Sequence, residues 1–165
     1  MFSIVIPIYN ESENILNLLD EIYVNLKKFN NYEIILVNDC STDNTLDVIK
    51  NISNQKIKLV NNIKNYGQSY SIHRGIKLSF YNIIITIDGD GQNDPADIPK
   101  LLEIYLSKKD IELVGGLRLK RRDTIIKIIS SKIANNIRSF ILNDDCKDTG
   151  CSLKIFNRKI FLDFP

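Results

Sequence analysis

The sequence is poor in the residues that soft-metal sites and disulfide frameworks require. It has a single histidine, His73, and three cysteines, none of them in a C-x-x-C spacing. With no second soft ligand near it, His73 is expected to be a solvated helix residue rather than a metal ligand or an acid–base group. The odd number of cysteines fits reduced thiols that pack as small core residues in a cytoplasmic compartment.

Long hydrophobic runs and an excess of one charge are absent as well. No uninterrupted apolar run approaches the ~20 residues that span a bilayer, so membrane contact is expected to be peripheral or to lie outside this chain. The 22 basic and 20 acidic residues give a net charge of +2, which offers no reason to expect a nucleic-acid partner. The stretch MFSIVIPIYNESE lacks a basic leader and turns acidic early, so a signal peptide is not expected.

Two common glycine-rich phosphate-binding motifs are missing. Where a dinucleotide fold carries G-x-G-x-x-G after its first strand, this chain has IYNESE, and no G-x-x-x-x-G-K-[ST] occurs. An EF-hand loop starting at Asp88 would need glycine and glutamate where Asn93 and Pro99 stand. Any phosphate must therefore be held by other means, and calcium storage is not expected.

Short apolar, β-branched runs alternate with helical patterns along the chain. Strands are predicted over residues 2–9, 32–38, 57–61, 82–87, 111–116 and 150–157. Helices are predicted over residues 15–29, 46–52, 72–76, 98–105 and 124–142 and from residue 158 onward. This order predicts an α/β, doubly wound, mainly parallel sheet with helices on both faces, in one domain over residues 1–165.

Two helix starts carry capping signals. Asn10 followed by Glu13 resembles a capping box for the first helix. Asp97, which stands before Ile98 and Pro99, is a candidate cap for the fourth helix.

Polar side chains follow three of the predicted strands. In an open α/β sheet, ligands bind beyond the carboxyl ends of the strands, so these side chains are expected to face one crevice. They are Tyr9, Asn10 and Glu11 after the first strand, Asn38 and Asp39 after the second, and Asp88 and Asp90 after the fourth.

The pair Asp88 and Asp90 raises an electrostatic problem. Two like charges so close together repel, unless a cation, a shared proton or open water relieves them. The glycines at 89 and 91 let both carboxylates turn toward one point. Oxygen-only ligands suit Mg²⁺ or Mn²⁺, which such sites bind through one or two carboxylates plus substrate phosphates. A solvated acidic turn is the alternative for this motif taken alone.

Six stretches together carry a family resemblance. FSIVIPIYNESENI, EIILVNDCSTDNT, NYGQSYSIHRGI, IIITIDGDGQNDP, VGGLR and DTGCSLKIF occur in an order and spacing that resemble family 2 glycosyltransferases, especially the dolichol-phosphate mannosyltransferase and polyprenyl-phosphate glycosyltransferase branch. The resemblance implies a GT-A fold, a nucleotide-diphosphate sugar donor, a divalent metal and inversion at the anomeric carbon. It also implies that the family's catalytic domains continue past this chain's C-terminus.

Carried over by position, the resemblance assigns roles on the donor side. Pro7, Tyr9 and Glu11 match the nucleotide-binding segment, and Asp39 matches the carboxylate that contacts the base. The metal-binding D-x-D-x-Q of the lipid-phosphate branch is matched by Asp88, Asp90 and Gln92. In the family pattern a glycine usually stands where this chain has Cys40.

The acceptor side rests on three further positions. Arg118 matches an arginine that meets donor or acceptor phosphate, although Leu117 replaces the serine that usually precedes it. Lys132 falls near a basic residue that holds the lipid phosphate. If the acceptor is instead a sugar hydroxyl, a carboxylate must take its proton, and Asp148 is the candidate. A strand-entry cap is the structural alternative for Asp148.

The expected function is inverting, metal-dependent transfer of a hexose from a GDP- or UDP-hexose to a polyprenyl phosphate. Asp90, Arg118 and Asp148 are the expected catalytic residues. The expected place is the cytoplasmic, inner face of the membrane, which the domain would contact peripherally. Transfer to a glycan or lipid hydroxyl, and nucleotide-sugar binding without turnover, are the two alternatives.

Overall fold

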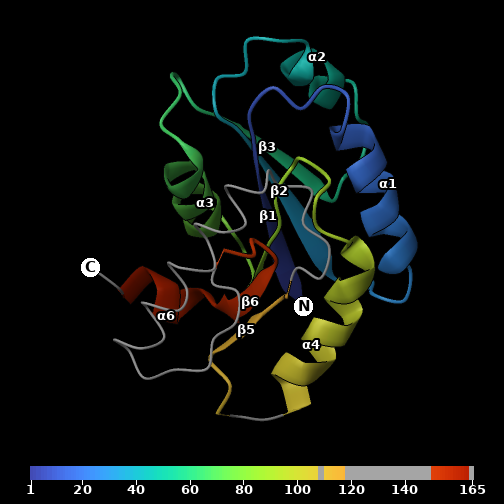
Figure 1. The fold of residues 1–165 in the computed structure, drawn as a ribbon, viewed down its shortest axis with the longest axis vertical. Helices are drawn as coiled ribbons and strands as arrows, with labels where there is room; N and C mark the ends of the chain where they lie inside the picture. The colour runs from blue at the N-terminus through green and yellow to red at the C-terminus, as the bar shows by residue number, and fades with distance from the viewer. Residues whose placement is uncertain (108–109, 118–149, 164–165) are drawn as a thin grey trace, which may run out of the picture.

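The described part of the chain forms an α/β domain around one mixed sheet (Figure 1). The computed structural model describes residues 1–107, 110–117 and 150–163. Within them, the sheet order is β3-β2-β1-β4-β6-β5. The strands are β1 (Phe2–Ile8), β2 (Tyr32–Asn38), β3 (Ile57–Asn61), β4 (Ile83–Thr86), β5 (Leu113–Gly115) and β6 (Lys154–Asn157). The helix predicted over residues 124–142 lies outside the described residues.

The sheet is parallel except at one strand. β1 pairs in parallel with β2 and β4, and β2 pairs in parallel with β3. β6 runs antiparallel to both β4 and β5, between which it lies. The predicted mainly parallel sheet is therefore confirmed, and the late strand β6, rather than β5, is the neighbour of β4.

Helices cover both faces of the sheet, as predicted (Figure 1). They are α1 (Ile15–Asn25), α2 (Thr45–Lys50), α3 (Gln68–Lys77), the short 3₁₀ helix η1 (Pro95–Asp97), α4 (Ile98–Ser107) and α6 (Arg158–Asp163). Alternate residues of β1 face opposite sides. Ile4 and Ile6 pack in the same core as residues of α1 and α4, whereas Val5 packs with Ile76 of α3. No helix of the described residues is long and apolar enough to cross a membrane.

The capping box expected at Asn10 is not formed. Helix α1 begins at Ile15, its N-cap residue is Asn14, and no side chain caps it. The Asn10 backbone has a φ of 58°, and its side-chain amide binds Thr42 of the next loop instead. The prediction was wrong because Asn10 satisfies its side chain across the sheet edge rather than within its own turn.

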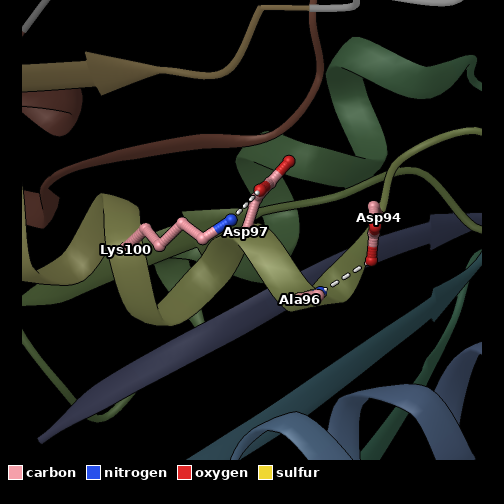
Figure 2. Close-up of polar contacts among 4 residues, drawn as sticks. All are labelled: Asp94, Ala96, Asp97 and Lys100. Atoms are coloured by element: carbon pink, nitrogen blue, oxygen red, sulfur yellow. Dashed lines mark hydrogen bonds and ion pairs between the residues drawn. The ribbon is translucent and has the colours of Figure 1, made fainter.

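The fourth helical segment also begins earlier than the sequence indicated. Asp94, not Asp97, is the cap: its carboxylate accepts a hydrogen bond of 2.9 Å from the backbone N–H of Ala96 (Figure 2). Pro95 follows at the first position of η1, where the missing N–H costs nothing. Asp97 forms an exposed ion pair with Lys100 at 3.3 Å, within the helix (Figure 2).

Gly75 is where α3 approaches the sheet most closely. A Cβ added there would lie 3.0 Å from Val37 Cγ2 and closer still to Val5 Cγ1. Both valines belong to buried strands and cannot move aside freely. The absent side chain therefore sets how near α3 lies to β1 and β2.

We expect Gly75→Ala to lower the free energy of unfolding. Overpacking costs about 1–3 kcal/mol, which exceeds the ~1 kcal/mol that alanine gains over glycine in a helix. The matched control is Gly115→Ala in β5, where an added Cβ meets nothing within 4 Å. Urea denaturation of the two variants checks the prediction, and a Gly75→Ala protein as stable as wild type would contradict it.

Candidate functional site

A cleft of about 370 Å³ lies at the carboxyl ends of the parallel strands β1, β2 and β4. This is the edge at which ligands bind in open α/β sheets. Six of the residues predicted from the sequence line it: Pro7, Tyr9, Glu11, Asp39, Asp88 and Asp90. The structure thus brings the segment predicted to bind the nucleotide and the D-x-D carboxylates to one cavity.

The loop after β1 is held by the loop that leads into α2. The side chain of Asn10 accepts a hydrogen bond of 2.8 Å from the Thr42 backbone N–H, and the Glu11 backbone N–H donates to Thr45 Oγ1 at 2.8 Å. Cys40, in the loop that leads into α2, has a φ of 60°, in the left-handed region that favours glycine. Glycine, which the family resemblance led us to expect at this position, would adopt this backbone shape easily.

Asp39 is a buried carboxylate that holds the loop before α3, which forms one wall of the cleft. Its Oδ1 accepts hydrogen bonds from Asn62 Nδ2 at 2.6 Å and from the Tyr66 N–H at 3.0 Å, and its Oδ2 accepts from the Gly67 N–H at 2.7 Å. Burial alone would raise the pKa of Asp39. The hydrogen bonds from Tyr66, Asn62 and Gly67 outweigh it and lower the pKa, so the carboxylate is ionised near neutral pH.

The pKa shift of Asp39 links this wall to stability. Because the folded-state pKa lies below the unfolded one, Asp39 contributes stability at every pH above its unfolded pKa. That contribution is lost as the pH falls through the folded-state pKa. At neutral pH the ionised carboxylate therefore holds the loop that carries Tyr66 and Gly67 in place.

The D-x-D loop packs tightly on the end of β1. A Cβ added at Gly89 would lie 3.1 Å from the Pro7 carbonyl oxygen, so glycine permits this approach. Asp88 Oδ1 accepts a hydrogen bond of 2.5 Å from Gln68 Nε2, at the start of α3. Asp90 Oδ1 accepts from the Gln92 backbone N–H at 3.0 Å. Gln92 itself is not among the residues that line the cleft.

The donor set fits a hard divalent cation. Asp88 and Asp90 supply only oxygen atoms, which suit Mg²⁺ and Mn²⁺. Across the described ranges no group of three or more histidine, cysteine or acidic side chains is placed to hold a metal. Two carboxylates agree with a metal whose remaining ligands are water and substrate phosphate, rather than with an all-protein cage.

A buried contact ties the D-x-D loop to the segment that precedes β6. Asn93 Nδ2 donates to Ser152 Oγ at 2.6 Å, and Cys151 Sγ lies 3.5 Å from Asn93 Oδ1. Thr86 Oγ1 donates to the Ser152 carbonyl oxygen at 2.6 Å. Cys151 is thus a core thiol, as predicted, whereas Cys40 is only partly buried and is not part of the core. The stretch that follows Asp148 in the sequence is joined to the loop of Asp88 and Asp90.

Other predicted residues lie elsewhere. Arg118, Lys132 and Asp148 lie outside the described residues, so their roles stay predictions. His73 is half-buried on α3, its ring 6.1 Å from that of Phe161, and is not among the cleft-lining residues.

The sequence analysis included Gly67 in a motif of the family resemblance, but it assigned no site role to the polar side chains that follow β3. Asn65, Gly67, Gln68 and Ser71 line the cleft, and Asn62 binds Asp39 behind it. The signal was available, because the rule that polar residues gather beyond parallel strand ends applies to β3 as much as to its neighbours. Asn61 ends β3, and Asn62 follows directly.

Comparison with known sequences agrees with this geometry. The model for "Glycosyl transferase family 2" matches residues 3–164. Undecaprenyl-phosphate 4-deoxy-4-formamido-L-arabinose transferase of Yersinia pestis is 34% identical over 163 residues, and that of Serratia proteamaculans is 33% identical over 162. Each match covers 96% of this chain and 49% of the relative, so the chain spans about half the length of these curated relatives.

Solved structures show the same fold. Glucosyl-3-phosphoglycerate synthase from Mycobacterium tuberculosis, in complex with UDP, aligns with a TM-score of 0.74 and 19% identity over 97% of this chain and 57% of that one. A mannosyltransferase from Pyrobaculum calidifontis, in complex with GDP-Man and Mn²⁺, aligns with a TM-score of 0.63 and 21% identity over 73% of this chain and 35% of that one. The predicted GT-A type of α/β fold is confirmed, and the chain belongs to glycosyltransferase family 2.

Proposed function

We propose that the chain binds a nucleotide-diphosphate sugar, GDP- or UDP-linked, and a divalent metal, and transfers the sugar with inversion to a polyprenyl phosphate. The observation that carries the proposal is the cleft in which Asp39 follows β2 while Asp88 and Asp90 follow β4. The curated relatives, named as undecaprenyl-phosphate sugar transferases, support the acceptor.

Strand spacing separates the two ends of the proposed donor site. β2 and β4 both pair with β1, so their ends lie about 10 Å apart, twice the interstrand distance. The base of the nucleotide would lie at Asp39 and its diphosphate at Asp88 and Asp90. The strand between them, β1, contains Pro7 and is followed by Tyr9 and Glu11. These three residues would contact the nucleotide along its length.

The proposed reaction breaks the bond between the anomeric carbon and the donor diphosphate and forms one to an acceptor phosphate oxygen. The electron pair of the broken bond leaves on the nucleoside diphosphate, whose negative charge grows in the transition state. Asp88 and Asp90, with Gln92 as a third candidate ligand, would hold a divalent cation, which would supply the positive charge that offsets this growth. Gln68 holds Asp88 toward the cleft through the hydrogen bond to its Oδ1.

A phosphate acceptor needs no strong base, because its oxygen is already ionised near neutral pH, its second pKa being ~6. Arg118 and Lys132 are proposed to bind that acceptor phosphate. A hydroxyl acceptor would need Asp148 to take its proton. The site of action is proposed to be the cytoplasmic face of the membrane, where a polyprenyl-phosphate headgroup is accessible.

The metal assignment predicts that UDP or GDP stabilises the protein much more with Mn²⁺ than without it. A ligand at 100 times its Kd contributes about 2.7 kcal/mol, which a thermal-shift measurement detects. Asp90→Asn should remove the metal-dependent part. Asp94→Asn is the matched control, because it removes one nearby charge that only caps η1. Equal stabilisation of wild type in excess chelator would contradict the assignment.

The base contact predicts a selective defect in Asp39→Ala. Loss of a hydrogen bond to an ionised group should weaken nucleoside diphosphate binding by ~1.5–3 kcal/mol. Binding of pyrophosphate with Mn²⁺ should be unchanged, since pyrophosphate has no base. Calorimetric titration of a variant with wild-type circular dichroism measures both. Equal losses for both ligands would mean that Asp39 acts on the diphosphate end or on the fold alone.

The acceptor assignment predicts a ranking of variants assayed with undecaprenyl phosphate. Lys132→Ala and Arg118→Ala should lose more kcat/KM than Asp148→Asn, because each leaves phosphate charge uncompensated. Asp148→Asn should lose less than the ~10²–10⁴-fold that general-base catalysis supplies. The reverse ranking in folded variants would identify a hydroxyl acceptor and overturn the phosphate one.

A further inference from the structure

A chain of hydrogen bonds runs from the surface of α3 to the buried carboxylate of Asp39. Arg74, on α3, donates through Nη1 to Asn62 Oδ1 and to the Asn61 carbonyl oxygen, the latter at 2.9 Å. Asn62 Nδ2 in turn donates to Asp39 Oδ1 at 2.6 Å and to Ser71 Oγ at 2.9 Å. These hydrogen bonds thus connect α3, the end of β3 and the end of β2.

The chemistry of the two outer groups fixes the orientation of the Asn62 amide. A guanidinium only donates hydrogen bonds and an ionised carboxylate only accepts them. The amide oxygen must therefore face Arg74, and the amide nitrogen must face Asp39. A flipped amide would lose both contacts, so only one orientation of the Asn62 amide satisfies both neighbours.

Burial makes this arrangement energetically important. Asn62 is 5% exposed, Asp39 is 3% exposed and Ser71 is fully buried. In such surroundings an unpaired polar group is costly, and hydrogen bonds in series polarise one another. The positive charge of Arg74 on the amide oxygen should strengthen the amide N–H as a donor to Asp39.

We propose that Asn62, supported by Arg74, is a positioning residue for base recognition, because its amide fixes the orientation in which the Asp39 carboxylate would accept a hydrogen bond from the base. The inference rests on the proposed function, in which Asp39 contacts the base. Asn62 and Arg74 are not among the residues that line the cleft, so they act through Asp39 rather than on the ligand.

The test compares each nucleotide with a version that cannot donate to a carboxylate. In UDP the donor is the imide N–H of uracil, and in GDP it is the ring N–H of guanine. Methylation of that nitrogen removes the donor and leaves the ribose and diphosphate unchanged. The ratio of the two dissociation constants, measured with Mn²⁺ for the nucleotide that binds wild type more tightly, isolates the base contact from the metal contact.

Wild type should bind the unmodified nucleotide about tenfold or more tightly than its methylated version. Asn62→Asp should bring the ratio close to one, because a second carboxylate would face Asp39 and repel it. Arg74→Gln should lower the ratio by a smaller factor, since it keeps a donor and removes the charge. If Asn62→Asp does not fold, the test uses Arg74→Gln alone. The Arg74 side chain lies partly at the surface, so its substitution should leave the protein folded.

Arg158→Gln is the matched control. Arg158 also donates to α3, through Nε to the Ile76 carbonyl oxygen at 2.9 Å and through Nη2 to that of Lys77 at 2.8 Å. These contacts lie at the other end of the helix from the cleft. The variant should lower stability without changing the ratio, which separates base recognition from general support of α3.

The outcomes separate the two proposals. A ratio that falls in the Asn62 or Arg74 variant and stays unchanged in Arg158→Gln supports the inference. A wild-type ratio that persists in the folded variants, or that falls equally in all of them, overturns it while leaving the proposed function intact. Failure of wild type to bind either nucleotide with Mn²⁺ overturns the proposed function, and the inference with it.

Discussion

The candidate site depends on the hydrogen bonds that the buried, ionised carboxylate of Asp39 accepts. This carboxylate lies at the end of β2 and accepts hydrogen bonds from the amide of Asn62 and from the N–H groups of Tyr66 and Gly67. Without these donors, burial would favour the neutral acid. With them, one charge both orders the loop that forms a cleft wall and remains available for a ligand donor.

The same strand-end geometry explains why the D-x-D carboxylates are tolerated. Asp88 is bound by Gln68 and Asp90 by the N–H of Gln92, so neither repels its neighbour without compensation. Gly89 lets their loop approach the end of β1. The two acidic ends of the cleft thus differ in their surroundings. Three fixed donors surround Asp39, whereas Asp88 and Asp90 each accept one hydrogen bond and are proposed to share a cation with the substrate.

Much of this arrangement could be predicted from the sequence, since parallel strands must end at one edge. That rule placed Tyr9, Asp39 and Asp88 at the cleft, where the structure has them. It was not applied to Asn62, which binds the buried carboxylate of Asp39, a residue distant in the sequence. The insertion of β6 beside β4 could not be predicted, because it depends on a pairing across some 70 residues. The cap expected at Asn10 failed because its amide found a tertiary partner.

Paramagnetic relaxation of a bound nucleotide by Mn²⁺ tests the central claim most directly, because the effect falls steeply with distance from the metal. With UDP or GDP in the cleft, the phosphorus resonances should broaden strongly and the base protons far less, and Asp90→Asn should abolish both effects. Base protons broadened as strongly as phosphorus, or broadening that survives in Asp90→Asn, would contradict a site with its metal at the D-x-D loop and its base at Asp39.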